Sequence, residues 1–260
     1  MTNQPNKSGG HYRSIFISDL HLGSKASRAD EICQFLKVHT CDNLFLVGDI
    51  IDGWRLKNRW YFPQEHINVI RRILTASKRG TTVRYLIGNH DEVLRRYIDE
   101  ELQLGNIYLI DEYEYTALNG QTYYIVHGDQ FDTLMIDKKW IMHLGDILYD
   151  LVVWVNIQLN RLRGLFGMKY WSLSGYLKYR TKQAVKFIQR YEEHLIHYCK
   201  KHDYDGIVCG HIHAPEMRFV ESVEYMNTGD FCDSCTAIVE TFDGEFKMIR
   251  YNEGDFYYDD

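Results

Sequence analysis

The stretch Ile15-Phe16-Ile17-Ser18-Asp19-Leu20-His21-Leu22-Gly23 decides how this chain is organised. Its β-branched and aromatic residues predict a buried strand that ends at Asp19. His21 follows two positions later, and Gly23 allows a sharp exit of the chain. A carboxylate and an imidazole at this spacing can converge on one metal ion, but an isolated pair is also typical of a turn with a satisfied histidine.

Four later stretches repeat the pattern of an apolar strand followed by metal-ligand residues beside glycine. They are Gly48-Asp49-Ile50-Ile51-Asp52 after residues 43–47, Gly88-Asn89-His90-Asp91 after 82–87, His127-Gly128-Asp129 after 122–126, and Gly210-His211-Ile212-His213 after 205–209. Ligands of open α/β sheets gather at the carboxyl ends of the strands. The recurrence therefore predicts one site assembled from five strand ends.

The segments between these strands carry helical apolar spacing. We expect helices over residues 28–38, 64–78 and 92–103, a strand over 107–110, and a hairpin that turns at Asn119-Gly120. Short strands are expected over 217–220, 224–226, 236–241 and 246–251. This alternation favours a layered α/β core with some antiparallel strands.

Length and composition limit the alternatives. The 260 residues, 45% of them hydrophobic, suffice for one large core with an insertion. The net charge of -6 argues against a general nucleic-acid binder. No run of about 18 uncharged apolar residues occurs, so we expect no membrane span, and we expect no signal peptide before the first strand. Six scattered cysteines, including Cys232 and Cys235 with CxxC spacing, favour structural thiols in a reducing, cytoplasmic compartment.

Residues 130–200 break the strand and helix alternation. Apolar residues recur at helical spacing between 140 and 162, and a second helix is expected over 177–201. Eight basic residues and no acidic one lie between positions 161 and 190. This bias fits a solvated helix face, an anion-attracting cap beside the site, or a surface that rests on anionic lipid. The candidate substrate-binding residues are Arg161, Arg163, Lys178 and Lys182, together with Asn89.

The ligand set has a definite chemistry. It contains carboxylate, amide and imidazole groups and no thiolate, which suits Mn²⁺, Fe²⁺ or Zn²⁺ and not a closed structural zinc site. The ligands are too many for one ion. Two divalent ions about 3.5–4 Å apart that share a carboxylate fit better, because such a pair activates a water molecule and neutralises a phosphoryl group.

In order and spacing, the five motifs resemble the signature blocks of the calcineurin-like metallophosphoesterases. The resemblance implies a four-layer α/β/β/α sandwich, here with a helical cap insertion, and a site of two metal ions, Mn²⁺ being the expected metal. It also implies the ligand roles: Asp19, His21 and His213 at one ion, Asn89, His127 and His211 at the other, and Asp49 bridging both.

The resemblance implies two catalytic residues beside the ions. His90 would bind phosphate or protonate the leaving oxygen, and Asp91 would orient His90. Asp52 is expected to brace its loop, and Asp129 and Asp132 are as consistent with structural roles as with substrate contacts. The remaining histidines are expected to be surface or core residues.

Within the family, the motifs and the position of the cap resemble the UDP-2,3-diacylglucosamine pyrophosphohydrolases of lipid A biosynthesis. An apolar helix face beside basic residues suits such an amphiphilic nucleotide-sugar. Members of that group carry arginine after the asparagine of the third block, whereas this chain has His90, the general phosphoesterase residue. A paralogue that acts on another phosphodiester, nucleotide or phosphomonoester is therefore an alternative, as is a non-catalytic binding protein on the same fold.

The expected organisation follows from these observations. Residues 11–129 and 201–252 would form the catalytic core, residues 130–200 the cap, and residues 1–10 and 253–260 flexible termini. The amphiphilic substrate and the basic cap also predict peripheral association with the cytoplasmic face of an anionic inner membrane. The oligomeric state stays open.

Overall fold

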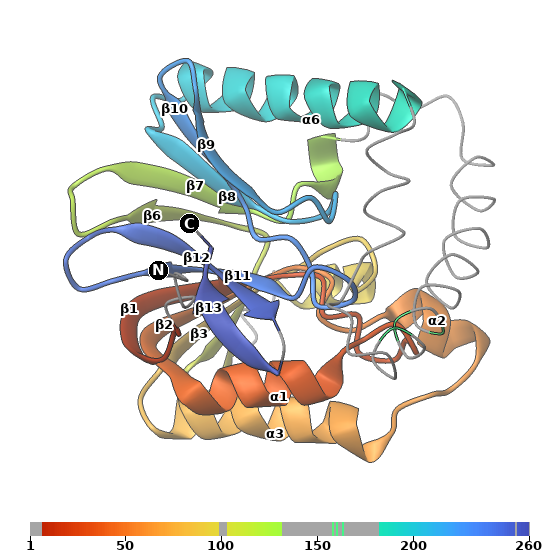
Figure 1. Cartoon of the computed structure of the whole chain (residues 1–260). Coiled ribbons are helices and arrows are strands. Elements are labelled where there is room, and N and C mark those ends of the chain that lie inside the picture. Colours follow the sequence, from red (N-terminus) through yellow and green to blue (C-terminus); the bar gives the residue numbers. More distant parts are fainter. Residues whose placement is uncertain are drawn as a thin grey trace.

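Two β-sheets stacked face to face form the centre of the molecule, and helices cover both outer faces (Figure 1). The computed structural model describes residues 7–98, 103–131, 158, 160, 163, 182–252 and 254–259. The predicted four-layer α/β/β/α sandwich is confirmed: α1 and α3 form one outer layer, and α6 forms the other.

The first sheet has eight strands and the second has five. In spatial order the first contains β13 (Asp255–Tyr258), β12 (Phe246–Asn252), β11 (Thr236–Glu240), β1 (Gly10–Ile17), β2 (His39–Val47), β3 (Thr82–Leu86), β5 (Ile107–Ile110) and β4 (Gln103–Leu104). The second contains β6 (Glu112–Thr116), β7 (Thr122–Val126), β8 (Gly206–Cys209), β10 (Val223–Asn227) and β9 (Glu216–Val220). The helices are α1 (Ala29–Val38), α2 (Gly53–Asn58), α3 (Gln64–Lys78), the 3₁₀ helix η1 (Glu92–Tyr97) and α6 (Lys182–Lys201).

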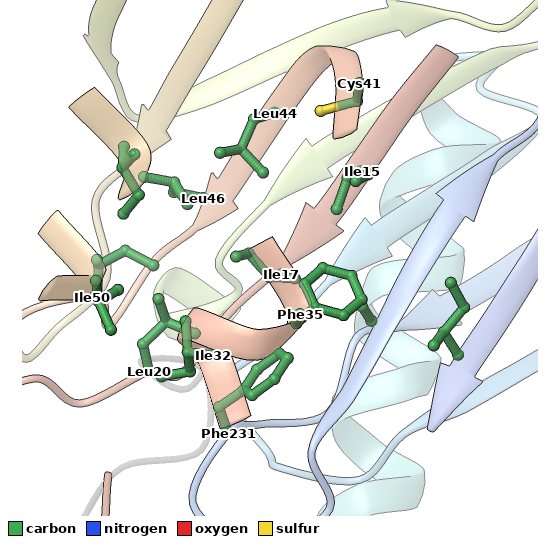
Figure 2. Packing of buried hydrophobic residues seen from close by; sticks show 14 of the residues in the cluster. Ile15, Ile17, Leu20, Ile32, Phe35, Cys41, Leu44, Leu46, Ile50 and Phe231 are labelled. Atoms are coloured by element: carbon green, nitrogen blue, oxygen red, sulfur yellow. The ribbon is translucent and has the colours of Figure 1, made fainter. Parts of the chain in front are cut away.

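Strand β1 shows why the central strands are apolar on both faces. Ile15 and Ile17 face α1, where they pack near Phe35 (Figure 2), and Phe16 faces the second sheet. Successive side chains of a strand point to opposite faces, so a strand between two layers must be apolar at every position. The uninterrupted run Ile15-Phe16-Ile17 is thus the signature of a strand buried on both sides.

The parallel pairing of β1, β2 and β3 brings their carboxyl ends to one edge of the first sheet. Strands β7 and β8 are parallel in the second sheet, and the backbone N–H of Gly210 donates to the carbonyl of His127 where these strands end. The five predicted motifs follow these five strands directly.

Several predicted boundaries differ from the structure. The helix expected over 92–103 is the short η1, and residues 99–102 lie outside the described part of the chain. Helix α6, which the sequence placed mostly in the cap, covers the second sheet with Tyr191, Leu195 and Cys199 buried against it. The boundary expected at residue 200 is therefore wrong, because the buried apolar face of α6 completes the fourth layer.

The chain termini are more ordered than predicted where they are described. Residues 255–258 form the edge strand β13, with Phe256 buried in the core of the first sheet. Ser8 donates its backbone N–H to the carbonyl of Phe256 and contacts Nε2 of His39 at 3.0 Å through its hydroxyl. These contacts replace the predicted flexibility of residues 7–10 and 255–258.

The helix predicted over 140–162 lies outside the described residues, apart from positions 158 and 160, which are helical, as is residue 163 just beyond it. In the described parts of the chain, no helix combines the length and the apolarity that crossing a membrane requires.

Candidate metal centre

Five of the seven predicted ligands share an unusual backbone conformation. Positive φ angles occur at eight described residues other than glycine, and five of them are predicted ligands. These five are Asp19 (52°), His21 (44°), Asp49 (54°), His211 (69°) and His213 (52°). L-residues rarely adopt this region, and such strain is concentrated at functional sites. The chain accepts this conformation after β1, β2 and β8, where the side chains turn toward a common centre.

One group of side chains gathers around Asp19. Nε2 of His213 lies 3.0 Å from Oδ1 of Asp19, and Nε2 of His21 lies 3.7 Å from the same oxygen. The two Nε2 atoms are 3.4 Å apart. These three side chains come from the ends of β1 and β8, and their ligand atoms lie close enough together to hold one metal ion.

A second group gathers around Asp49. Nε2 of His127 lies 3.4 Å from Oδ2 of Asp49, and His211 completes a set of potential ligands with them. Asp49 also belongs to a set with His21 and His90, with Nε2 of His21 3.8 Å from Oδ2 of Asp49. Asp49 therefore lies between the two groups, as expected of a carboxylate shared by two ions.

Unpartnered polar atoms support a metal at the second position. Oδ1 of Asn89 and Nε2 of His127 are buried and lack a hydrogen-bond partner among the described residues. A buried polar atom without a partner is costly, so such an atom usually has a role. The donor set of amide oxygen, imidazole nitrogen and carboxylate oxygen fits Mn²⁺, Fe²⁺ or Zn²⁺. The sequence-predicted ligands thus lie where two ions would be held.

Outer hydrogen bonds orient these ligands. Nδ1 of His127 lies 2.8 Å from the carbonyl of Val47, which leaves Nε2 to face Asp49. Oδ2 of Asp19 accepts from the backbone N–H of His211 at 3.0 Å and from the hydroxyl of Ser18. Such contacts fix the imidazole tautomer and the carboxylate orientation.

Glycine is required at two positions because the site is packed so closely. A Cβ atom on Gly88 would lie 2.6 Å from the backbone nitrogen of Asp49 and 2.8 Å from Nε2 of His127. A Cβ on Gly48 would collide with the ring of His127. The glycines of the predicted motifs therefore let the strand ends approach one another.

The buried charges shift one another's pKa values. Burial is the largest influence on Asp19 and would raise its pKa, but His213, His21 and His127 together hold that pKa well below its usual range. The pKa of Asp49 is lowered in the same way by His127 and His21. Burial would lower the pKa of His127, but Asp49 and Asp19 raise it to about 10. The site is thus built to concentrate negative charge, which protonated histidines balance.

His90 stands beside the two groups, with Nε2 3.9 Å from Oδ2 of Asp49. Its Nδ1 lies 3.0 Å from Oδ1 of Asp52, whose pKa is lowered by His21 and His90 despite burial. An ionised carboxylate only accepts hydrogen bonds, so Nδ1 of His90 carries the proton and Nε2 faces the site.

Asp91 does not orient His90, contrary to the prediction. Its carboxylate accepts hydrogen bonds from the backbone N–H groups of Ile50 (2.9 Å) and Gly88 (2.6 Å) and from the hydroxyl of Tyr85 (2.8 Å). The orienting contact comes instead from Asp52, because α2 begins there and turns this carboxylate toward the ring. Asp91 braces the loops that carry Asp49 and Asn89.

Other acidic residues of the motifs have structural contacts. Asp129 receives two hydrogen bonds from the guanidinium of Arg95, which also donates to the carbonyl of Ile87. Asp132 lies outside the described residues. Arg95 thereby ties η1 to the ends of β3 and β7.

Sequence reasoning missed three residues at the site. Oδ2 of Asp230 lies 3.7 Å from Nδ1 of His213, and the fully buried Tyr191 of α6 lies against Gly128 with its hydroxyl 3.4 Å from the carbonyl of His127. The indole of Trp54 lies against the ring of His90, with centroids 4.2 Å apart. Tyr191 and Asp230 lie outside the five motifs in the sequence. Only Trp54 could have been found from the sequence, because it lies two residues after Asp52 of the second motif.

Of the predicted substrate-binding cations, Arg161 and Lys178 lie outside the described residues. Arg163 lies in a helix. Lys182 begins α6, and the structure describes only the backbone of this residue. That these four basic residues bind the substrate stays a prediction. Cys232 and Cys235 are free and buried, and burial raises the pKa of both thiols, which agrees with their expected structural role.

Known proteins resemble this chain in sequence. The family model described as calcineurin-like phosphoesterase matches residues 12–215. The chain is similar to a UDP-2,3-diacylglucosamine hydrolase of Neisseria gonorrhoeae, with 28% identity over 177 residues that cover 66% of this chain and 64% of that protein. It is 23% identical over 223 residues to a Yersinia pestis protein of the same name, covering 80% of this chain and 85% of that one.

Solved structures with a similar arrangement have lower identity. An archaeal phosphodiesterase matches with a TM-score of 0.42 and 14% identity, covering 92% of this chain and 99% of that one. Vacuolar protein sorting 29 of Cryptosporidium parvum matches with a TM-score of 0.48 and 10% identity, covering 97% of each chain.

Proposed function

Because this chain belongs to the calcineurin-like phosphoesterase family and is a metal-dependent phosphoester hydrolase, we propose that it cleaves UDP-2,3-diacylglucosamine to UMP and 2,3-diacylglucosamine 1-phosphate. The observation that carries the reaction type is Asp49, whose carboxylate lies between two groups of ligand atoms. The names of the similar proteins from Neisseria and Yersinia support the substrate.

In this proposal the residues divide as their geometry suggests. Asp19, His21 and His213 would hold one ion, Asn89, His127 and His211 would hold the other, and Asp49 would serve both. Two divalent ions held there supply an activated water molecule and neutralise charge on the phosphoryl oxygens. We propose Mn²⁺ as the metal, which the absence of thiolate ligands supports.

His90 has a separate task in the reaction. Asp52 engages Nδ1 and leaves Nε2 facing the site, where it would donate a proton to the oxygen that leaves phosphorus. The attacking water loses one proton to solvent and forms the new bond to phosphorus, the bond to the leaving oxygen breaks, and that oxygen takes a proton from His90, which regains one from solvent. Asp52 keeps the ring oriented throughout.

The protein is proposed to work in the cytoplasm, peripherally at an anionic inner membrane. The amphiphilic substrate and the basic stretch over 161–190 support this location. In the same proposal, Arg163 of the insertion and Lys182 at the start of α6 contact the diphosphate.

His90 favours a second candidate function, hydrolysis of a phosphodiester or phosphomonoester with an alcohol leaving group. A phosphate leaving group is a weak base and needs little protonation, whereas an alkoxide needs a proton in the transition state. A histidine held by Asp52 beside Asp49 is the group that such a leaving oxygen requires.

One experiment separates these substrates. The Mn²⁺-loaded protein is incubated in mild detergent with UDP-2,3-diacylglucosamine and, in parallel, with a small chromogenic phosphodiester. Release of UMP that is lost in Asp49→Ala supports the lipid substrate. Cleavage of the chromogenic diester alone supports the second candidate, and no metal-dependent cleavage of either substrate contradicts both.

A further inference from the structure

Helix α2 begins directly against His90. The backbone N–H of Gly53 donates to the carbonyl of His90 at 3.0 Å, and a Cβ atom on Gly53 would lie 2.7 Å from that oxygen. The backbone N–H of His90 donates to Oδ1 of Asp49 at 2.9 Å. Both backbone groups of His90 are therefore fixed, and only its side chain has freedom to move.

One hydrogen bond does not fix a ring. The contact of Nδ1 with Asp52 still allows the imidazole to pivot about that atom, and the side chain of His90 is 21% exposed. Movement of the ring about this contact would carry Nε2 away from Asp49. A fixed orientation therefore needs contacts on the sides of the ring as well.

Two rings supply those contacts. The His21 ring meets His90 edge to face, with centroids 4.6 Å apart and planes at 87°. The indole of Trp54 lies along the ring from another direction, with centroids 4.2 Å apart and planes at 32°. The second pair is tilted, with ring centroids close enough for direct contact. His21 is already committed to the metal centre, so Trp54 is the ring available for positioning His90.

Trp54 is itself held in place. It belongs to the first turn of α2, whose N-cap is Asp52, the residue that contacts Nδ1 of His90. Its indole N–H donates to Oε1 of Glu92 at 3.4 Å, which links α2 to the start of η1. The hydrogen bond and the ring contact thus reach His90 from one short helix.

We infer that Trp54 is a positioning residue, which keeps the His90 ring oriented so that Nε2 faces the reacting phosphoryl group. This inference rests on the proposed role of His90 in hydrolysis. Trp54 acts through His90 and needs no contact with the substrate. Its removal should lower kcat and leave KM and metal content nearly unchanged.

The test compares Trp54→Ala, Trp54→Phe and a double variant with His90→Ala, using two aryl phosphodiesters with good and poor leaving groups. Trp54→Ala should lower kcat about tenfold on the poor leaving group, and less on the good one. Trp54→Phe should restore most of the rate, because a phenyl ring can stack in the same place. In the His90→Ala background, Trp54→Ala should have no further effect.

Trp60→Ala is the matched control. Trp60 lies in the segment after α2 and is 76% exposed, so its loss removes a second indole from this region at a position open to solvent. Its kcat should equal that of the unaltered protein. Equal losses in the two variants would overturn the inference, as would additive effects of Trp54→Ala and His90→Ala.

A readout without turnover keeps the inference testable even if hydrolysis fails. In ¹⁵N-histidine spectra of the protein loaded with diamagnetic Zn²⁺, Trp54→Ala should shift the His90 resonances and weaken the Nδ1–H signal, while Trp60→Ala should not. Unchanged His90 resonances in Trp54→Ala would overturn the positioning role. Absence of metal-dependent hydrolysis in the unaltered protein would instead contradict the proposed function.

Discussion

Oδ2 of Asp49 lies 3.4 Å from Nε2 of His127, although the two residues follow strands of different sheets. Asp49 follows β2 of the first sheet, and His127 follows β7 of the second. The stacked sheets thus meet at their strand ends through a carboxylate and an imidazole. Because Asp49 also lies near His21, it joins the ligand groups of the two proposed ions.

Asp49→Ala should abolish metal binding at the Asp49–His127 position and weaken it at the other. Loss of a shared carboxylate removes several kcal/mol of transition-state stabilisation, so kcat/KM should fall by about three orders of magnitude or more. Metal content after gel filtration and kcat/KM measure the two effects. Asp42→Ala, on the same strand with its side chain 45% exposed, is the control and should keep both. Full metal content in Asp49→Ala would contradict the proposal that both ions share Asp49 as a ligand.

His90→Ala should keep both metals and lose turnover. Removal of a general acid typically costs about 10²- to 10⁴-fold in rate. Asp52→Asn should give a smaller loss in the same direction, because an amide orients the ring less firmly than the carboxylate that contacts Nδ1. Metal analysis and kcat on a substrate with a poor leaving group check this prediction. Unchanged turnover of His90→Ala on every substrate would remove His90 from the mechanism.

Asp91→Asn should destabilise the fold. Asp91 is 1% exposed and accepts three hydrogen bonds, whereas an asparagine would place an amide N–H group against one of the donors. The unpaired group should lower the free energy of unfolding by roughly 1–3 kcal/mol. Denaturant titration measures this loss, and Tyr85→Phe, which removes one donor, should lose less. A fall in kcat that matched His90→Ala without any loss of stability would restore the orienting role to Asp91.

Metal binding should release protons. Asp49 and Asp19 raise the pKa of His127 from 6.5 to about 10, so the metal-free site holds a proton at pH 8 that an ion must displace. Calorimetry of Mn²⁺ binding in two buffers of different ionisation enthalpy should report this release, and apparent affinity should rise with pH. Equal heats in the two buffers would contradict the predicted release of protons.

The same shift predicts the pH dependence of the metal-free fold. A histidine whose pKa is raised on folding contributes stability that is fully present below pH 6.5 and is lost as the pH rises to about 10. The melting temperature of chelator-treated protein should therefore fall over this interval. The metal-loaded protein should not show this fall, because ligand nitrogen atoms are then held by the ion.

Much of the fold could be predicted because the motifs coincide with strand ends. Helix α3 was predicted with its observed bounds, 64–78, and the strand 107–110 and the hairpin turn at Asn119-Gly120 were also confirmed. Residues 255–258 were predicted to be flexible but form a strand. The prediction was wrong because only Phe256 is fully buried there and the segment is short and acidic. Helix α6 was placed in the cap because a helical pattern shows which face is apolar but not which layer covers it.

By itself, the sequence determined which strands are buried on both faces, that their ends carry oxygen and imidazole ligands, and hence the family. Only the tertiary structure decided how those residues are paired. Asp52 orients His90 while Asp91 braces backbone, and Trp54, Tyr191 and Asp230 complete the surroundings. The physical reason is that ligand identity is local chemistry that can be read from each strand end. Which side chains contact one another depends on backbone turns at positive φ and on contacts between distant segments. No local sequence pattern encodes these features.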